Sequence, residues 1–242
     1  MRHRRQFSVS AGRLIMATEK ELMDKDTKNA NPQISPREHG PLRVEGPVNF
    51  FDARGNQIDP LRKKKGNIAL CRCGSSRDKP FCDGNHRNTG FSSAKVIGGE
   101  QDQRTDYEGE EITVHDNRGI CAHIGYCADE LPEVFRVGTE PWIDPDGAPG
   151  ERVKEQTRRC PSGALNHSVD GVEYWDAERP PAIQVVAEGP YFVTGGIELE
   201  DTERGQGASF EHYALCRCGH SKNKPFCDGK HKQASFADTG VF

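Results

Sequence analysis

The feature that most constrains this chain is an internal repeat that is rich in cysteine. Residues 70–86 read LCRCGSSRDKPFCDGNH, and residues 215–231 read LCRCGHSKNKPFCDGKH. From the first Cys to the final His, 12 of 16 aligned positions are identical, at a constant offset of 145 residues. Such agreement indicates two copies of one structural unit. We therefore expect the same local structure twice in the fold.

The cysteines of the chain fall into groups of three. There are nine in all, so they cannot all pair as disulfides within the chain. Threefold grouping indicates metal sites whose fourth ligand is of another kind, and thiolate ligands favour a reducing compartment. The groups are Cys71, Cys73 and Cys82, then Cys121, Cys127 and Cys160, and finally Cys216, Cys218 and Cys227.

The repeated motif has the spacing Cys-x-Cys, eight residues, then Cys-Asp-Gly-x-His. Thiolate and imidazole ligands suit iron–sulfur clusters, zinc or copper(I). Three Cys and one His can hold tetrahedral zinc, but structural zinc sites usually have a wider Cys spacing. The tight Cys-x-Cys step can instead hold one iron of a two-iron cluster, with the later Cys and His on the other iron. Asp suits a helix N-cap and Gly a tight backbone, which predicts that His86 and His231 lie in a first helical turn.

Two serines recur inside the motif at equivalent positions. Ser76 and Ser221 lie in the eight-residue loop between the second and third cysteines. Their hydroxyl groups are predicted either to donate hydrogen bonds to cluster sulfur or to stabilise the turn. The sequence leaves both roles open.

Both motifs resemble the CDGSH iron–sulfur domain of the NEET family, over roughly residues 41–95 and 185–237. They depart from the family pattern only before the His, at Asn85 and Lys230, which are not ligand positions. The resemblance implies two [2Fe–2S] clusters and an internal pseudo-dimer, a monomer with a pseudo-two-fold axis. The implied ligands are Cys71, Cys73, Cys82 and His86 in one motif, and Cys216, Cys218, Cys227 and His231 in the other.

Between the repeats lies a different pattern, Cys121-x5-Cys127 followed at a distance by Cys160-Pro161. It resembles single-cluster ferredoxins with three cysteines and the divergent mono-cluster domain that is found fused to CDGSH motifs. Three Cys fit a [3Fe–4S] cluster, whereas a [4Fe–4S] cluster needs a fourth ligand, for which His123 is the nearest candidate. The alternative reading is a small domain with three spare thiols.

These observations predict an α+β fold. It combines a small β-rich NEET-like pseudo-dimer, built from the two CDGSH repeats, with an inserted α+β ferredoxin-like domain. Only 33% of the residues are hydrophobic, and the 26 Gly and 15 Pro favour turns over long helices. The expected division is a disordered N-terminal tail over 1–40, a first CDGSH unit over 41–103, the ferredoxin-like domain over 104–178 and a second CDGSH unit over 179–242.

Several classes of protein are disfavoured. A net charge of −4 with mixed signs is a poor basis for nucleic-acid binding, and no apolar run is long enough to cross a membrane. No catalytic triad, phosphate loop or dinucleotide motif is present, so we expect no enzymatic activity. The first 18 residues contain four Arg and no acidic residue, which is typical of a mitochondrial presequence or of a start-site artefact upstream of Met16. We expect a cytoplasmic, bacterial-type protein, with the mitochondrial matrix as the alternative.

The predicted function is electron transfer or redox sensing with iron–sulfur clusters. A donor of clusters to apo-proteins and a structural zinc protein are the alternatives. The expected partners are redox proteins or apo cluster acceptors. Because an imidazole ligand must be unprotonated to bind metal, we also predict that acid destabilises the clusters of the two repeats.

Overall fold

The structure is a computed structural model that describes residues 31–60, 68–97, 102–174 and 177–242. Within these residues, short strands form three sheets of four, five and four strands, joined by a few short helices. The predicted α+β class is therefore confirmed. The two repeats build the first two sheets, and the segment between the repeats builds the third.

The two repeats exchange strands. The first sheet has the order β12-β1-β2-β5, so that β12 of the second repeat completes a sheet of the first. The second sheet has the order β13-β11-β10-β3-β4, with β3 of the first repeat paired to β10 of the second. The strands are β1 (Gln33–Pro36), β2 (Leu42–Glu45), β3 (Asn49–Phe51), β4 (Gln57–Ile58), β5 (Ile68–Leu70), β10 (Ala182–Val185), β11 (Tyr191–Thr194), β12 (Glu198–Leu199) and β13 (Tyr213–Leu215).

Both exchanged pairs are parallel, and the two lie at equivalent places in the repeats. Ile34 of β1 is in register with Leu199 of β12, and Ile183 of β10 is in register with Phe50 of β3. The other neighbours in these sheets are antiparallel. Each of the two sheets contains strands from both repeats, so the two repeats form one folded unit.

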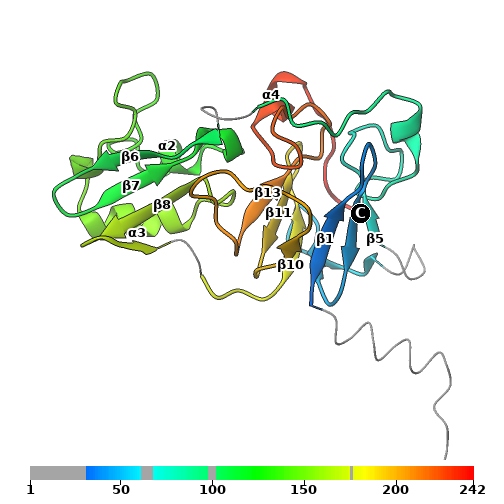
Figure 1. The fold of residues 1–242 in the computed structure, drawn as a ribbon, viewed down its shortest axis with the longest axis horizontal. Helices are drawn as coiled ribbons and strands as arrows, with labels where there is room; N and C mark the ends of the chain where they lie inside the picture. Colours follow the sequence, from blue (N-terminus) through cyan, green and yellow to red (C-terminus); the bar gives the residue numbers. More distant parts are fainter. Residues whose placement is uncertain (1–30, 61–67, 98–101, 175–176) are drawn as a thin grey trace, which may run out of the picture.

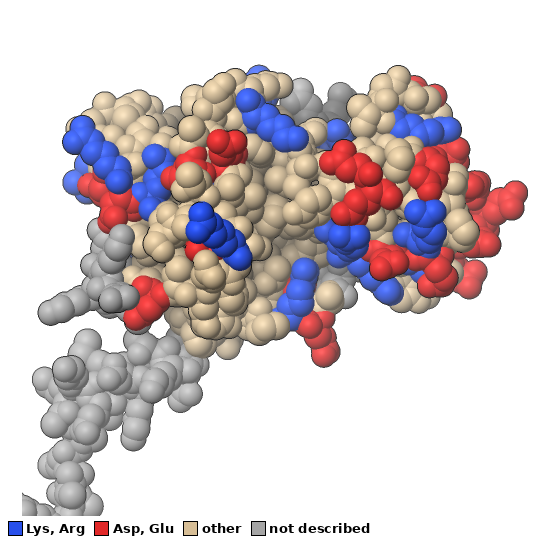
Figure 2. Space-filling view, turned by 180° about the vertical axis from the view of Figure 1, so that it is seen from behind, with Lys and Arg blue, Asp and Glu red and all other residues tan. Residues whose placement is uncertain are grey.

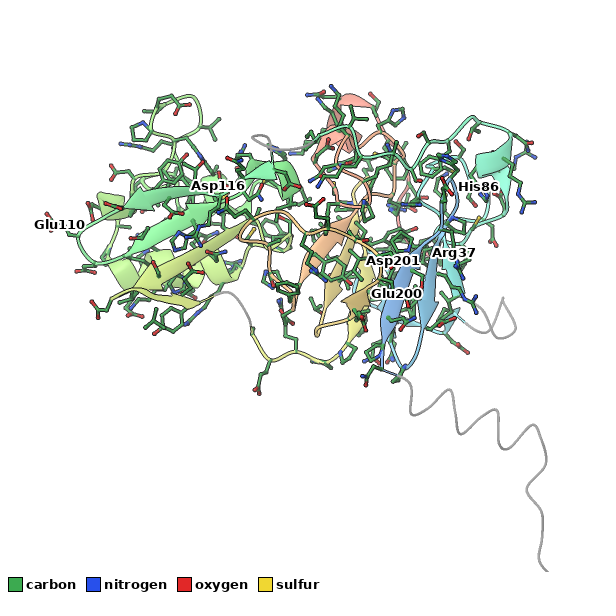
Figure 3. All side chains as sticks on the ribbon, in the orientation of Figure 1. Arg37, His86, Glu110, Asp116, Glu200 and Asp201 are labelled. Atoms are coloured by element: carbon green, nitrogen blue, oxygen red, sulfur yellow. The ribbon has the colours of Figure 1, made fainter. Side chains whose placement is uncertain are left out.

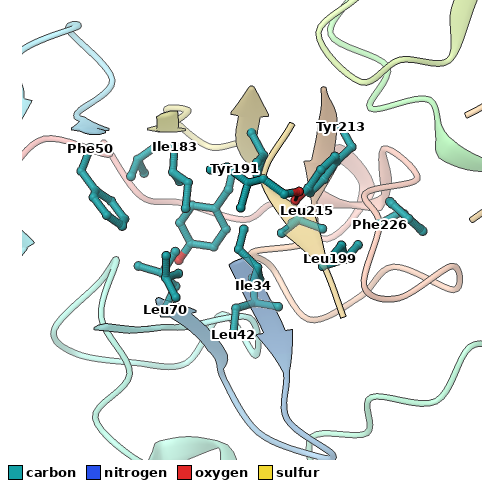
Figure 4. Packing of buried hydrophobic residues seen from close by; sticks show 14 of the residues in the cluster. Ile34, Leu42, Phe50, Leu70, Ile183, Tyr191, Leu199, Tyr213, Leu215 and Phe226 are labelled. Carbon is teal, nitrogen blue, oxygen red and sulfur yellow. Dashed lines mark hydrogen bonds between the residues drawn. The ribbon is translucent and has the colours of Figure 1, made fainter. Parts of the chain in front are cut away.

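A single apolar core lies between the two exchanged sheets. Alternate strand residues point inward, as the buried–half-buried–buried pattern of β5 shows. Ile34, Ile183 and Tyr191 are fully buried there, and Figure 4 shows residues from both repeats meeting around Tyr191. This shared core positions the motifs, because each motif loop begins where β5 or β13 ends.

The predicted disordered tail over 1–40 is wrong at its C-terminal end. Gln33–Pro36 form β1, which lies between β2 and β12. The local sequence is polar, but Ile34 is buried in the core and the strand has a partner on each side. Tertiary pairing therefore overrides local composition. Residues 1–30, including the proposed targeting segment, lie outside the described residues.

The inserted unit has its own sheet, in the order β6-β7-β8-β9, and its own apolar core. Helix α3 packs against β8, and Val153 on its inner face is fully buried. Asp170 and Gly171, both with positive φ, form the tight turn between β8 and β9. The elements are β6 (Thr105–Glu108), β7 (Thr113–Asp116), η4 (Arg118–Ile120), α2 (Tyr126–Glu130), η5 (Pro145–Gly147), α3 (Gly150–Arg158), β8 (Leu165–Val169) and β9 (Val172–Tyr174).

The three parts of the molecule lie in a row (Figure 1). The inserted unit occupies one end, the second motif with α4 (Lys230–Gln233) lies in the middle, and the first motif with η2 (Asn85–Arg87) lies at the other end. Acidic side chains gather on the inserted unit, where Glu108, Glu110 and Glu111 are exposed (Figure 2). Among the described residues, no helix is long and apolar enough to cross a membrane.

Candidate metal centres

The predicted ligands of the first motif meet in two pairs. The Sγ atoms of Cys71 and Cys73 are 3.6 Å apart, and Cys82 Sγ is 3.4 Å from His86 Nδ1. Cys71 follows directly on β5, and a bridge between Leu70 and Phe81 brings the loop back alongside that strand. His86 lies in the short helix η2, as predicted for the first helical turn. Figure 3 places it at the far end of the molecule from the inserted unit.

The second motif repeats this arrangement. Cys216 Sγ and Cys218 Sγ are 3.8 Å apart, and Cys227 Sγ is 3.4 Å from His231 Nδ1. His231 lies in the first turn of α4. Four side chains in each motif are thus arranged as a Cys–Cys pair and a Cys–His pair.

The Asp-Gly step turns the chain so that the His faces its Cys. Asp83 accepts hydrogen bonds from the backbone N–H groups of Arg77 and Asn85, at 2.9 Å each. Gly84 has a φ of +88°, a left-handed conformation that favours glycine. Asp228 and Gly229 repeat the device in the second motif. The N-cap positions are Gly84 and Gly229, so the predicted N-cap role of the Asp is wrong, and each Asp instead stabilises the turn one residue earlier.

The two recurrent serines stabilise the turn. Ser76 Oγ donates to the Phe81 carbonyl at 2.6 Å and accepts from the Asp78 N–H at 3.0 Å. Ser221 makes the same two bonds within its own loop. Both side chains are buried. Of the two roles predicted for them, the structure shows the turn-stabilising one.

The donor groups are suited to a metal that prefers thiolates. All nine cysteines are free thiols. A hydrogen bond from Cys73 lowers the pKa of Cys71 to about 6, and one from Cys218 lowers the pKa of Cys216 to about 7. The thiolate is the form that binds metal, so Cys71 and Cys216 are the readier ligands, whereas the same hydrogen bonds raise the pKa of Cys73 and Cys218. In the part of the chain that the structure describes, no three His, Cys, Asp or Glu side chains converge on a point where one ion would fit.

The arginine between the first two cysteines of each motif is a structural residue that the sequence reasoning missed. Arg72 Nε donates to the Gly40 carbonyl at 2.7 Å, and Arg217 Nε donates to the Gly189 carbonyl at 2.9 Å. Arg217 also pairs with Asp238 at 3.0 Å. Both arginines are buried and tie their motif to the strand hairpin behind it. Their identity in the two repeats was a signal that pointed to them.

The ligand loops of the two motifs are in direct contact with each other. Cys73 and Cys218 form an isolated antiparallel bridge, so the ligand loops share backbone hydrogen bonding. The Tyr191 hydroxyl, from the second repeat, donates to the Cys71 carbonyl at 2.7 Å and to the Pro80 carbonyl at 3.0 Å. Each ligand set is therefore held partly by the other repeat.

The third group of cysteines lines one cavity of about 850 Å³. Cys121, Cys127 and Cys160 reach it from η4, α2 and the end of α3, and α4 of the second motif closes its far side. Burial raises the pKa of Cys121 to about 12 and that of Cys127 to about 11. Buried thiols become thiolates most readily when a metal supplies positive charge. The structure thus places Cys160 at the same cavity as Cys121 and Cys127, more than 30 residues earlier in the chain.

His123 lines the same cavity, but it has other contacts as well. Its Nδ1 accepts a hydrogen bond from Arg118 at 3.4 Å, and its ring lies against Gly229 of the second motif. Burial, followed by the charge of Arg118, lowers its pKa, which keeps the imidazole neutral as a ligand must be. Its role as a fourth ligand stays a prediction.

A buried carboxyl group near this cavity escaped the sequence reasoning. Asp116 ends β7 and is 2% exposed, and neither of its side-chain oxygens has a hydrogen-bond partner. Burial raises its pKa to about 7, against the opposing effect of the Arg118 charge. The guanidinium of Arg118 lies 4.5 Å from the ring of Trp142, which lines the cavity. Nothing in the local sequence distinguishes Asp116 from a surface aspartate.

Comparison with known proteins agrees with this geometry. The family model of the iron-binding zinc finger of CDGSH type matches residues 39–87 and 188–232, and the model of the divergent 4Fe-4S mono-cluster matches residues 107–170. The uncharacterized protein YjdI of Escherichia coli K12, and that of strain O157:H7, is 39% identical over 61 residues, which are 25% of this chain and 80% of the relative. No solved structure matches. The chain therefore belongs to the CDGSH family of iron-binding proteins, with two motifs and an inserted divergent 4Fe–4S mono-cluster domain.

Proposed function

We propose that each CDGSH motif holds one [2Fe–2S] cluster, in a NEET-like pseudo-dimer that is a monomer in solution. The observation that carries the proposal is the pairing of the ligands. A Cys–Cys pair at 3.6 or 3.8 Å and a Cys–His pair at 3.4 Å supply two ligands for each of two irons. The ligands are Cys71, Cys73, Cys82 and His86 in one motif, and Cys216, Cys218, Cys227 and His231 in the other.

The inserted unit is proposed to hold one ferredoxin-type cluster through Cys121, Cys127 and Cys160. The shared cavity of these three thiols supports this assignment. A [3Fe–4S] cluster needs no further protein ligand. A [4Fe–4S] cluster would take His123 as its fourth ligand through Nε2, because Arg118 already bonds to Nδ1. EPR of the oxidised protein separates these forms, since an oxidised [3Fe–4S] cluster gives a signal and an oxidised [4Fe–4S] cluster of this type does not.

The proposed role is electron transfer or redox sensing, without enzymatic activity of its own and with redox proteins as partners. When bound, iron–sulfur clusters supply one-electron chemistry. The chain contributes ligand loops that are held by hydrogen bonds of Arg72, Arg217 and Tyr191, which favour small structural change on electron transfer. A His ligand raises the reduction potential above that of an all-Cys site, so these centres are expected to be mild rather than strong reductants.

Reductive titration of the anaerobically purified protein tests this role. We expect the visible absorbance to bleach on addition of dithionite and to return on addition of air or ferricyanide, through several cycles, with iron and sulfide retained. Loss of iron and sulfide in the first cycle would contradict electron transfer. A colourless protein that contains zinc would overturn cluster binding itself.

The second candidate function is donation of clusters to apo-proteins. The observation that favours it is the partial exposure of Cys73, Cys82 and His86 in the first motif. Mixing the loaded protein with an apo-ferredoxin separates the two functions. Transfer within minutes would support donation, and retention alongside reversible reduction would support electron transfer.

A further inference from the structure

The two CDGSH motifs have the same ligand geometry but differ in exposure. In the second motif, Cys216, Cys218, Cys227 and His231 are all buried, and none is more than 5% exposed. In the first motif only Cys71 is buried, and Cys73, Cys82 and His86 are half-buried. Because the sequences of the motifs are nearly identical, the difference must come from what surrounds them.

The covering segment of the second motif is residues 119–124 of the inserted unit. Asn223, a residue of the motif loop that is fully buried, donates through Nδ2 to the Gly119 carbonyl at 2.7 Å. Ala122 packs on Cys227 and Ala214, and Ile124 packs on the same cluster. His123 lies so close to Gly229 that a Cβ there would come within 2.5 Å of its ring.

The covering segment has no counterpart on the first motif within the described residues. Position 78, which corresponds to Asn223, is an aspartate that is half-buried. The chain that follows each motif does reach the other motif: Val96 N–H donates to the Lys222 carbonyl at 2.6 Å, and Phe242 lies in the hollow beside Ser76. Because each motif is reached by such a segment, the crossing segments do not by themselves distinguish the two motifs. Figure 1 shows the inserted unit beside α4 and away from η2.

We propose that residues 119–124 close the second site, so that metal bound at the first site exchanges with chelators and thiol-bearing acceptors while metal at the second site is retained. The inference rests on the proposed function only in requiring that both motifs bind metal. Access to the second site needs the covering segment to move away from buried contacts, and such local opening slows exchange. The inserted unit thereby makes two sites of nearly the same sequence differ in their accessibility.

Extraction of iron from the full loaded chain by EDTA tests the proposal. Iron and sulfide content is measured first, so that failure to bind clusters is seen separately. We expect two phases of absorbance loss from the CDGSH sites, with the second slower by roughly tenfold or more. His86→Cys should change the spectrum of the fast phase and His231→Cys that of the slow phase. Equal rates at the two sites would overturn the proposal.

A residue swap between the repeats supplies the matched control. Asn223→Asp gives the second loop the residue of the first and removes the donor to Gly119, so the slow phase should approach the fast one. Asp78→Asn makes the reverse change in the first motif, which the covering segment does not reach. It should leave the rates of both phases unchanged. If Asn223→Asp leaves the slow phase unchanged, the covering segment is not what retains the metal.

Alkylation of the cysteines provides a second readout, in which thiols at both sites are compared in one preparation of known metal content. After brief treatment of the full chain with N-ethylmaleimide, peptide mapping should find Cys73 and Cys82 modified and Cys218 and Cys227 protected, by about tenfold or more in rate. Modification of all four thiols at the same rate, in chains with equal metal content at the two sites, would contradict the proposal.

Discussion

Cys73 and Cys218 face each other across an isolated antiparallel bridge. The bridge joins the two ligand loops at the centre of the pseudo-symmetric pair. The chains approach so closely here that a Cβ on Gly74 would lie 2.4 Å from the Cys218 carbonyl oxygen, and one on Gly219 would lie 2.6 Å from that of Cys73. The integrity of one site therefore depends on the backbone of the other.

Gly74→Ala is expected to destabilise both motifs. Gly74 has a φ of +78° and no room for a methyl group, because the backbone of the other motif blocks it. Gly55→Ala is the matched control, since Gly55 has a φ of +80° but open space around it. The control should cost about 1 kcal/mol, and Gly74→Ala clearly more, with iron lost from both motifs. Thermal unfolding and iron analysis measure this, and equal effects of the two variants would contradict it.

Replacement of either His ligand by Cys should protect the cluster at that site from acid. Protonation of the imidazole removes it from the metal as the pH falls, whereas a thiolate ligand is less easily displaced at mildly acid pH. Decay of the visible absorbance at about pH 5 should slow for the site that carries His86→Cys or His231→Cys. An unchanged decay rate in both variants would show that these residues are not the ligands.

Asp116→Asn should stabilise the inserted unit more at high pH than at low pH. The unfolded chain releases the proton of this carboxyl near the ordinary pKa of 3.8, and the folded chain releases it near 7. Between these values the folded state holds the extra proton, so its stability falls as the pH rises. The gain of the variant over the wild type should grow by about 2 kcal/mol between pH 5 and pH 8. Denaturant unfolding at both pH values measures this, and a gain independent of pH would contradict it.

Tyr191→Phe, a change in the second repeat, should weaken the retention of metal at the first site. The hydroxyl donates to the Cys71 and Pro80 carbonyls, and its loss removes this donor from the Cys71 carbonyl at a cost of about 1–2 kcal/mol, whereas the Pro80 carbonyl keeps the Cys71 N–H at 2.8 Å. Tyr213→Phe is the control, because its hydroxyl donates to Ile197 at 2.7 Å, outside the motifs. Both variants should lower the melting temperature, but only Tyr191→Phe should speed iron loss from the first site. Equal rates of iron loss would argue against this link.

The ligand pairs could be predicted from the sequence because their geometry is local. Cys82 and His86 are four residues apart, and the intervening Asp-Gly step turns the chain by itself. The turn at Asp170 and Gly171 is local in the same sense. The inserted cysteines could be grouped only through resemblance, since Cys160 reaches the cavity by tertiary folding.

The strand exchange and the unequal burial of the motifs could not be predicted in this way. Strand β1 has one large apolar residue, Ile34, and forms because β2 and β12 flank it. The burial of Cys227 and the crowding at Gly229 depend on residues about a hundred positions away, Ala122 and His123. No periodicity or spacing in one segment reports such contacts, which depend on the three-dimensional packing of separate elements. The division predicted at residues 103/104 and 178/179 stays a prediction.

Metal and sulfide analysis of the anaerobically purified full chain tests the central claim most directly. If the paired ligands hold clusters, the protein is red-brown, contains iron and acid-labile sulfide, and loses part of both in Cys71→Ser and a further part in Cys216→Ser. A colourless protein that contains zinc, without sulfide, would contradict the assignment of the two motifs as iron–sulfur sites.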